Sequence, residues 1–168
     1  MSDFKTNLND NRLAEEAAHG LDGVIDKTDP KHSKHLYGLV VQYEDIDAGG
    51  IVYHSTYLNF AERARSALLR ASKFDVQYWL AQENQGFVIT HIETDYLSPA
   101  KLHNRLIVET SCLQLGGASA LLQQNINSFD RGHIFARVMV KAAWVDIELG
   151  PRKFPEPLQM VLRSFQPK

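Results

Sequence analysis

The chain has 168 residues and a mass of 19.0 kDa, with 44% apolar and 23% charged residues, which predicts one globular domain with a modest appendage. A net charge of -2 excludes the usual electrostatic signature of a nucleic-acid-binding protein. No apolar run approaches the ~18 residues of a membrane-spanning helix, and the N-terminus lacks a signal pattern. The lone Cys112 cannot form an internal disulfide, which favours a reducing compartment. We therefore expect a cytoplasmic protein that acts on a small molecule.

The first 36 residues are predicted to form a flexible acidic tail. Residues 1–30 carry seven acidic and three basic side chains, a net charge of -4, whereas the remainder has 13 acidic and 15 basic side chains, a net charge of +2. The segment shows no sustained hydrophobic period, so it buries too little apolar area to offset its ordering entropy. At most a short helix around residues 12–19 is predicted, and His35 is expected in solvent. Deleting residues 1–35 should leave activity and melting temperature nearly unchanged.

The folded domain is predicted to span residues 37–158. A β-branched and aromatic run predicts a strand over 37–43, and two adjacent glycines predict a loop over 44–54. Apolar residues then recur at the spacing of one helix face over 55–71, and this face is wide enough for a deeply buried helix. A second short helix is predicted over 76–83, after an aspartate that is a good N-cap.

The rest of the domain is predicted to be extended. Alternating patterns and turn residues predict four strands, over 87–97, 105–115, 118–129 and 134–147. The order of one strand, one buried helix and a four-stranded antiparallel meander predicts an α+β fold, an antiparallel sheet wrapped around a long central helix. Prolines end the last strand, and residues 159–168 are predicted to form a short C-terminal tail or helix.

The segment 43–65 (YEDIDAGGIVYHSTYLNFAERAR) carries the clearest chemical signal. Asp47 lies in a loop just before the buried helix, and Gly49 and Gly50 allow the backbone to approach a substrate closely. The helix N-terminus near His54 offers unpaired backbone N–H groups and a positive dipole end, which suit a carbonyl or a developing oxyanion. A carboxylate beside such a helix start favours hydrolysis of an activated acyl group. Taken alone, the pattern fits a cap or turn role for Asp47 at least as well.

The same segment resembles the signature of the 4-hydroxybenzoyl-CoA thioesterase-like branch of the hotdog-fold superfamily. It is most similar to the Tol-Pal-associated acyl-CoA thioesterases of bacteria. The residues that carry the resemblance are 47–54 (DAGGIVYH), 57–58 (YL), 62–65 (ERAR), 87–88 (FV), 95–100 (DYLSPA) and 155–156 (PE). The similarity covers roughly residues 37–158 and leaves out the first 36.

The resemblance implies a hotdog fold, with the sheet wrapped around the helix that starts near Ser55. Subunits of this family pair into a continuous sheet, form tetramers as dimers of dimers, and hold their active sites at the dimer interface. By the same resemblance, Asp47 is the catalytic carboxylate, which attacks the thioester carbonyl or activates water. The backbone N–H of His54 would polarise the carbonyl oxygen. The implied partner is acyl-CoA, with acyl carrier protein thioesters as the other substrate class.

Neighbouring side chains are secondary candidates. The His54 side chain either orients Asp47 or a water molecule, or packs at a subunit interface. Tyr53 and Tyr57 either line the acyl pocket or belong to the core. Glu62 is either a substrate-binding or catalytic carboxylate on the central helix, or the i,i+3 partner of Arg65, which helix-pair geometry favours.

Several basic residues are candidates for contact with the CoA phosphates, although most basic side chains only form a solvated surface. They are Lys101, Arg137, Arg152 and Lys153. Asp45 and Asp47 have the spacing of a metal-binding pair but lack a third ligand nearby, so no metal is expected. No Walker or Rossmann glycine pattern is present, and no cofactor is expected.

Two classes of function are compatible with these features. The first is a thioester hydrolase that releases free acid and thiol. The second is a non-catalytic hotdog module that binds acyl thioesters or acts as a scaffold for envelope or lipid enzymes. Asp47 favours hydrolysis, because a pure binding module does not need a carboxylate at the carbonyl.

Overall fold

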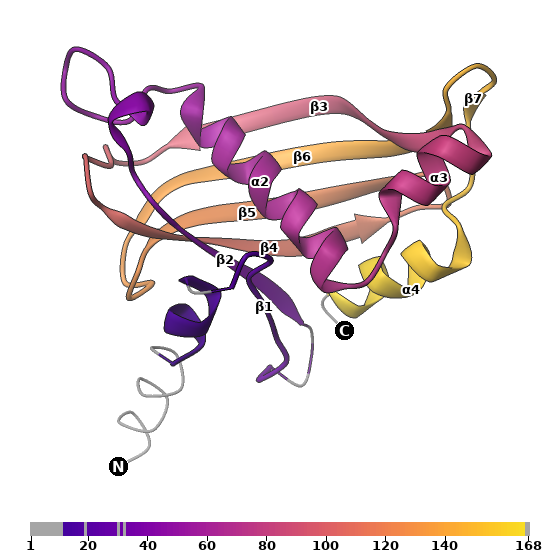
Figure 1. The fold of residues 1–168 in the computed structure, drawn as a ribbon, viewed down its shortest axis with the longest axis horizontal. Coiled ribbons are helices and arrows are strands. Elements are labelled where there is room, and N and C mark those ends of the chain that lie inside the picture. Colours follow the sequence, from indigo (N-terminus) through magenta and orange to yellow (C-terminus); the bar gives the residue numbers. More distant parts are fainter. Residues whose placement is uncertain (1–11, 19, 30, 32, 167–168) are drawn as a thin grey trace.

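The structure, a computed structural model, describes residues 12–18, 20–29, 31 and 33–166. One curved antiparallel sheet forms a layer, and the long helix α2 (Thr56–Ala71) crosses one of its faces (Figure 1). The strands in the described part are β1 (Val24–Asp26), β2 (Lys34–Val40), β3 (Gln85–Tyr96), β4 (Arg105–Leu115), β5 (Ser119–Ser128), β6 (Ile134–Asp146) and β7 (Gly150–Pro151). The predicted α+β class, with a sheet around a central helix, is confirmed.

The strand order differs from the predicted meander. The order is β1-β2-β4-β5-β6-β3, with β7 beside β6, and neighbouring strands are antiparallel. β4, β5 and β6 follow one another as predicted, but β3 pairs with β6 rather than with β4. The prediction is wrong at β3 because β2 occupies the second edge of β4, so β3 joins the open edge of β6. In the described part of the chain, the outer edge of β3 stays unpaired.

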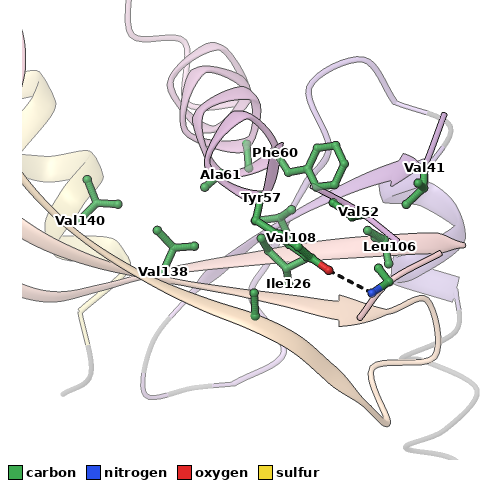
Figure 2. Close-up of a cluster of buried hydrophobic side chains, with 13 residues drawn as sticks. Val41, Val52, Tyr57, Phe60, Ala61, Leu106, Val108, Ile126, Val138 and Val140 are labelled. Atoms are coloured by element: carbon green, nitrogen blue, oxygen red, sulfur yellow. Dashed lines mark hydrogen bonds between the residues drawn. The ribbon is translucent and has the colours of Figure 1, made fainter. Parts of the chain in front are cut away.

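The apolar face of α2 forms the main core with the inner face of the sheet. The helix buries residues at spacings of three and four: Tyr57, Phe60, Ala61, Ala64, Ala67 and Leu68. Figure 2 shows the first turns of α2 above Val108, Ile126 and Val138, which lie on β4, β5 and β6 respectively. Each large apolar side chain buried here contributes about 1.5–3 kcal/mol. The predicted central helix is therefore confirmed, and its burial fixes where its N-terminus lies.

A short helix follows α2 and connects it to the edge strand. Helix α3 (Val76–Glu83) begins where predicted, because the Asp75 side chain accepts a hydrogen bond from the Tyr78 N–H at 3.0 Å. It ends at Asn84, whose φ of 52° is left-handed. Asparagine tolerates this conformation, so the helix stops before Gly86 and β3 starts directly afterwards.

The C-terminal segment is part of the folded domain. Helix α4 (Glu156–Ser164) confirms the helical alternative for the C-terminus, but it starts before the predicted boundary at residue 158. Its Leu158 and Leu162 are buried in a second apolar cluster that also holds Trp144. These contacts attach the helix to the end of the sheet that carries α3 (Figure 1).

The predicted flexible tail is wrong for the described part of the N-terminal segment, whereas residues 1–11 lie outside the described residues. Residues 12–18 are helical, and β1 pairs with β2. Ala14 and Ala17 are buried against Leu36 and Ile107, on the sheet face opposite α2. A helix and a strand this short give no readable periodicity, and contact with the sheet stabilises them.

His35 is buried rather than solvated. Its side chain is fully inaccessible, and Nε2 donates to the Asp22 carbonyl oxygen at 2.7 Å. In the part of the chain that the structure describes, Nδ1 has no hydrogen-bond partner. Burial lowers the pKa of His35, against the smaller raising effect of the hydrogen bond to Asp22. The first β-strand pair therefore carries a buried neutral imidazole.

Candidate active site

A cleft of about 410 Å³ opens beside the N-terminus of α2. Figure 1 shows the loop that precedes α2 on the same side of the molecule as the end of β3. Residues from this loop, from the start of α2 and from the end of β3 line the cleft. Its lining residues are Asp47, Ile51, Val52, His54, Tyr57, Tyr96, Leu97, Ser98 and Pro99. Three predicted site residues therefore meet here, namely Asp47, His54 and Tyr57.

A tight turn holds the Asp47 carboxylate. Its Oδ1 accepts a hydrogen bond from the Gly49 N–H at 2.8 Å, and its carbonyl oxygen accepts one from the Gly50 N–H at 3.0 Å. Gly50 has a φ of 74°, and a β-carbon at Gly49 would lie 3.0 Å from Oδ1. Asp47 is exposed, and its Oδ2 accepts no hydrogen bond from any described residue. One carboxylate oxygen thus fixes the turn, whereas the other is unpaired among the described residues, and Asp47 itself lines the cleft.

The start of α2 supplies an unpaired hydrogen-bond donor from another residue that lines this cleft. The Val52 N–H bonds to the Ala100 carbonyl, and the Tyr53 N–H bonds to the Asp45 carbonyl, both at 2.9 Å. The next N–H, that of His54, donates no hydrogen bond within the described ranges. The Ser55 side chain does not cap the helix either. An unpaired donor therefore remains at the positive end of the helix dipole.

Two tyrosines line the cleft. Tyr57 is 3% exposed, and its hydroxyl accepts a hydrogen bond from the Ala100 N–H at 3.0 Å, the dashed line in Figure 2. Burial raises the pKa of Tyr57. The Tyr96 hydroxyl donates to the His54 carbonyl oxygen at 2.9 Å. Sequence reasoning missed Tyr96 as a site residue, and its only signal was its position in the DYLSPA motif.

The His54 side chain packs between aromatic rings. Its ring centroid lies 4.3 Å from that of Tyr53 and 6.4 Å from that of Tyr96. Among the described residues, the imidazole makes no hydrogen bond with Asp47. Tyr53 is about half exposed and does not line the cleft. The catalytic role predicted for the His54 side chain and the substrate-binding role predicted for Tyr53 stay predictions.

Asp45 has a structural role. It is buried, and its Oδ2 accepts a hydrogen bond from the Gln42 N–H at 2.7 Å, which caps the 3₁₀ turn η1 (Tyr43–Asp45). The strand predicted over 37–43 therefore ends earlier, at Val40. No group of three or more metal-ligating His, Cys, Asp or Glu side chains occurs among the described residues. No helix in the same ranges is long and apolar enough to cross a bilayer.

Glu62 lies in a different cavity of the same chain. It forms an ion pair with Arg65, which confirms the predicted i,i+3 contact. Arg65 also donates to the Oε1 atom of the buried Gln124 at 2.6 Å, which ties the pair to the sheet. Together with Phe87 and other apolar side chains, Glu62 lines a cavity of about 130 Å³ beneath the second half of α2. Within one chain, Glu62 therefore does not meet Asp47.

The predicted phosphate contacts are scattered. Lys101 lies beside the cleft, where its backbone forms an isolated antiparallel β-bridge with Ile51. Arg137 donates to a β5 asparagine on the sheet face away from α2. Arg152 and Lys153 follow β7 at the opposite end of β6, roughly 30 Å away at the ordinary rise of a strand. Within one subunit, only Lys101 is near Asp47.

Comparison with known proteins decides the family. Residues 41–165 match the model of the thioesterase-like superfamily. The chain belongs to this superfamily. The acyl-CoA thioesterase YbgC of Haemophilus influenzae is 38% identical over 127 residues, which are 75% of this chain and 92% of that protein. The long-chain acyl-CoA thioesterase FadM of Escherichia coli is 31% identical over 97 residues, which are 58% and 72% of the two chains.

Solved structures of thioesterases share the fold. A probable thioesterase from Bartonella henselae is 30% identical, with a TM-score of 0.68 over 73% of this chain and 99% of that one. The 1,4-dihydroxy-2-naphthoyl-CoA thioesterase Slr0204 from Synechocystis has a TM-score of 0.73 over 77% and 96% of the two chains, at 20% identity. The latter likeness concerns the fold alone. The predicted hotdog fold of this thioesterase-like chain is confirmed.

Proposed function

We propose that this protein hydrolyses an acyl-CoA thioester to the free acid and CoA in the Asp47 cleft. Membership of the thioesterase-like superfamily makes the chain a thioester hydrolase, and the names of its relatives support acyl-CoA as the substrate class. One observation carries the proposal for the site. The unpaired oxygen of Asp47 and the unpaired N–H of His54 belong to residues that line the same cleft.

The proposed reaction uses these two groups on opposite parts of the thioester. The carbonyl oxygen accepts a hydrogen bond from the His54 N–H, which stabilises negative charge as it develops there. In one route, Asp47 takes a proton from water while the water oxygen attacks the carbonyl carbon. The tetrahedral intermediate then collapses, the C–S bond breaks, and the thiolate of CoA leaves. A thiolate is a good leaving group, so the route does not require a strong general acid.

In the second route, the unpaired oxygen of Asp47 itself attacks the carbonyl carbon. Collapse then expels the CoA thiolate and leaves a mixed anhydride between the acyl group and Asp47. Water hydrolyses the anhydride and regenerates the carboxylate. Hydrolysis in ¹⁸O-labelled water under single-turnover conditions separates the routes. Label in the Asp47 carboxylate indicates the anhydride, whereas label only in the released acid shows that water attacks the acyl carbon, as it does in the direct route.

We propose further that two copies of the chain pair through β3. The outer edge of β3 carries exposed apolar side chains, with Val88, Ile89 and Ile92 at 42%, 41% and 39% exposure. An unpaired apolar edge strand promotes aggregation unless another strand covers it. Antiparallel pairing would place the Tyr96 end of one β3 beside the Phe87 end of the other. That arrangement would bring the Asp47 cleft of one copy near the Glu62 cavity of its partner.

This pairing supports a role for the Glu62 cavity as a site for the acyl group, because its other walls are largely apolar. It also supports CoA contacts from basic residues that lie far from the cleft within one chain. The resemblance to the Tol-Pal-associated thioesterases supports a tetramer of two such dimers and a cytoplasmic reaction. A sedimentation measurement tests the assembly, and a stable monomer at micromolar concentration would contradict it.

Replacement of Asp47 by asparagine tests the site. Asparagine keeps the Oδ1 acceptor for the Gly49 N–H, so the turn should remain intact. We expect kcat to fall by about 10²–10⁴, the usual contribution of one acid–base group. Glu44→Gln, at an exposed carboxylate in the preceding turn η1, is the matched control and should retain wild-type turnover. Glu62→Gln should have a smaller effect than Asp47→Asn.

The assay uses a panel of short, branched, aromatic and long acyl-CoAs, because the length of the acyl pocket depends on both subunits. Near-wild-type turnover of Asp47→Asn on every substrate would disprove the assignment of Asp47. A larger loss in Glu62→Gln than in Asp47→Asn would move the catalytic carboxylate to α2. Binding without turnover by the wild-type chain would favour the non-catalytic module.

A further inference from the structure

Tyr96 links the end of the edge strand to the start of the central helix. It is the last residue of β3 and is 50% exposed, yet its hydroxyl donates to the His54 carbonyl oxygen at 2.9 Å. The two residues are 42 positions apart in the sequence. An exposed tyrosine has water as an alternative partner, so this directed hydrogen bond needs a structural or functional reason.

The ring of Tyr96 is held in place from two sides. Its centroid lies 5.7 Å from that of Tyr57 and 6.4 Å from that of His54, both in edge-to-face contact. The backbone beneath it is anchored as well, because Tyr96 pairs with Ala136 and the next N–H bonds to the Phe135 carbonyl at 2.9 Å. The hydroxyl of Tyr96 is therefore presented to the cleft from a rigid strand end rather than from a loop.

The segment that Tyr96 contacts is fixed at neighbouring points too. The Val52 N–H bonds to the Ala100 carbonyl, and the Ala100 N–H bonds to the Tyr57 hydroxyl. Between these anchors, the carbonyl of His54 is held by Tyr96. The N–H of the same residue donates no hydrogen bond to any part of the described chain. A hydrogen bond thus restrains His54 at its carbonyl oxygen, while its backbone N–H stays available as a donor.

We propose that Tyr96 is a positioning residue for thioester hydrolysis, which holds His54 by its carbonyl so that the His54 N–H keeps a fixed direction toward the thioester carbonyl. This inference rests on the proposed function of the cleft. The hydroxyl acts on the substrate through the His54 backbone. Preorganised donors stabilise an oxyanion without reorganising at the moment of reaction, and this advantage is lost when the donor's residue can rotate.

Tyr96→Phe removes the hydroxyl and keeps the ring contacts. We expect kcat to fall about tenfold with KM unchanged within about twofold, well below the ~10²–10³ lost when an oxyanion donor itself is removed. The melting temperature should stay within about 3 °C of wild type, since one half-exposed hydrogen bond contributes little to stability. Tyr78→Phe, at a tyrosine of similar exposure on α3, is the control and should leave all three quantities unchanged.

A second readout reports on the carbonyl itself. The acyl-CoA that the wild-type chain hydrolyses fastest is labelled with ¹³C at the thioester carbonyl and bound to Asp47→Asn. The infrared stretch of the bound carbonyl should lie below its value in water, because a fixed donor polarises it. In the double variant Asp47→Asn, Tyr96→Phe this downshift should shrink. A merely structural tyrosine would lower the melting temperature and leave the carbonyl frequency unchanged, which would overturn the proposal.

The two hypotheses fail in different ways. Full activity of Asp47→Asn overturns the proposed function of the cleft, and the role of Tyr96 falls with it. A slow Asp47→Asn together with wild-type kcat in Tyr96→Phe overturns only the role of Tyr96. A fall in kcat accompanied by a smaller carbonyl downshift supports both.

Discussion

Replacing Gly38 by alanine should displace the N-terminal helix from the outer face of the sheet. Gly38 lies within β2, and a β-carbon at this position would meet the Ala18 Cα at 2.5 Å, the Ala18 nitrogen at 2.8 Å and the Ala17 carbonyl oxygen at 3.0 Å. All three are backbone atoms, so no side chain can rotate away. β2 is paired with strands on both sides, and the helix is therefore the element that moves.

The size of the effect follows from the contacts of the helix. Carbon atoms prefer a separation of about 3.5–4.0 Å, so the helix must move outward by about 1 Å or detach. Detachment exposes the buried side chains of Ala14 and Ala17 and the half-buried Leu13. Burial of these three side chains contributes about 3 kcal/mol to the free energy of unfolding. Overpacking by one methyl group lowers the free energy of unfolding by about 1–3 kcal/mol. Alanine is more stable than glycine in a strand by about 0.5–1 kcal/mol, which offsets part of this loss. The expected net loss is about 1–2 kcal/mol.

Thermal unfolding and hydrogen exchange measure this loss. A decrease of about 1–2 kcal/mol lowers the melting temperature by about 2–8 °C in a chain of this size. Exchange of the amides in residues 12–18 should accelerate. Gly117→Ala is the matched control, because nothing lies within 4 Å of a β-carbon there. Both variants are compared at one protomer concentration, since assembly shifts apparent stability. Equal stability and equal exchange in the two variants would refute the docking of this helix at Gly38.

Two further predictions concern buried titratable groups. Burial lowers the pKa of His35, so below about pH 6.5 the unfolded imidazole binds a proton that the folded one does not, and stability falls as pH decreases. Between about pH 7 and 5, the wild-type melting temperature should fall more steeply than that of His35→Gln, and parallel slopes would contradict this. Burial raises the pKa of the Cys112 thiol to about 11. Iodoacetamide at about pH 8 should therefore label Cys112 only in urea, and rapid labelling of the native chain would contradict its burial.

Local patterns in the sequence are sufficient to predict most elements and the candidate groups of the loop before α2. The periodicity of 55–71 predicted α2 because the core lies on one side of the helix, and the same spacing shows in its buried residues. The aspartate before α3 predicted its cap because that hydrogen bond is local. Asp47 and the start of α2 are predicted to lie together for the same reason, since only six residues lie between Asp47 and His54.

Contacts between distant segments were decided only by the tertiary structure. The position of β3 beyond β6 depends on β2, which competes for the edge of β4. The N-terminal helix is too short to show a hydrophobic period. It packs against Gly38, where a β-carbon would meet backbone atoms of the helix. Tyr96 reaches His54 only because β3 ends beside α2.

The length and charge of the chain allowed a single domain with an acidic appendage, and the structure shows that much of this appendage belongs to the domain. The sequence predicts that residues 1–35 are dispensable, because their composition is polar and the elements among them are short. The helix over residues 12–18 and strand β1 are stabilised by contact with the sheet, and no local sequence pattern predicts that contact. Sequence determined which groups are the candidates for the proposed chemistry, because that information lies within one turn and one helix start. Tertiary structure decided which residues hold those groups in place, because that depends on pairing between strands far apart in the chain.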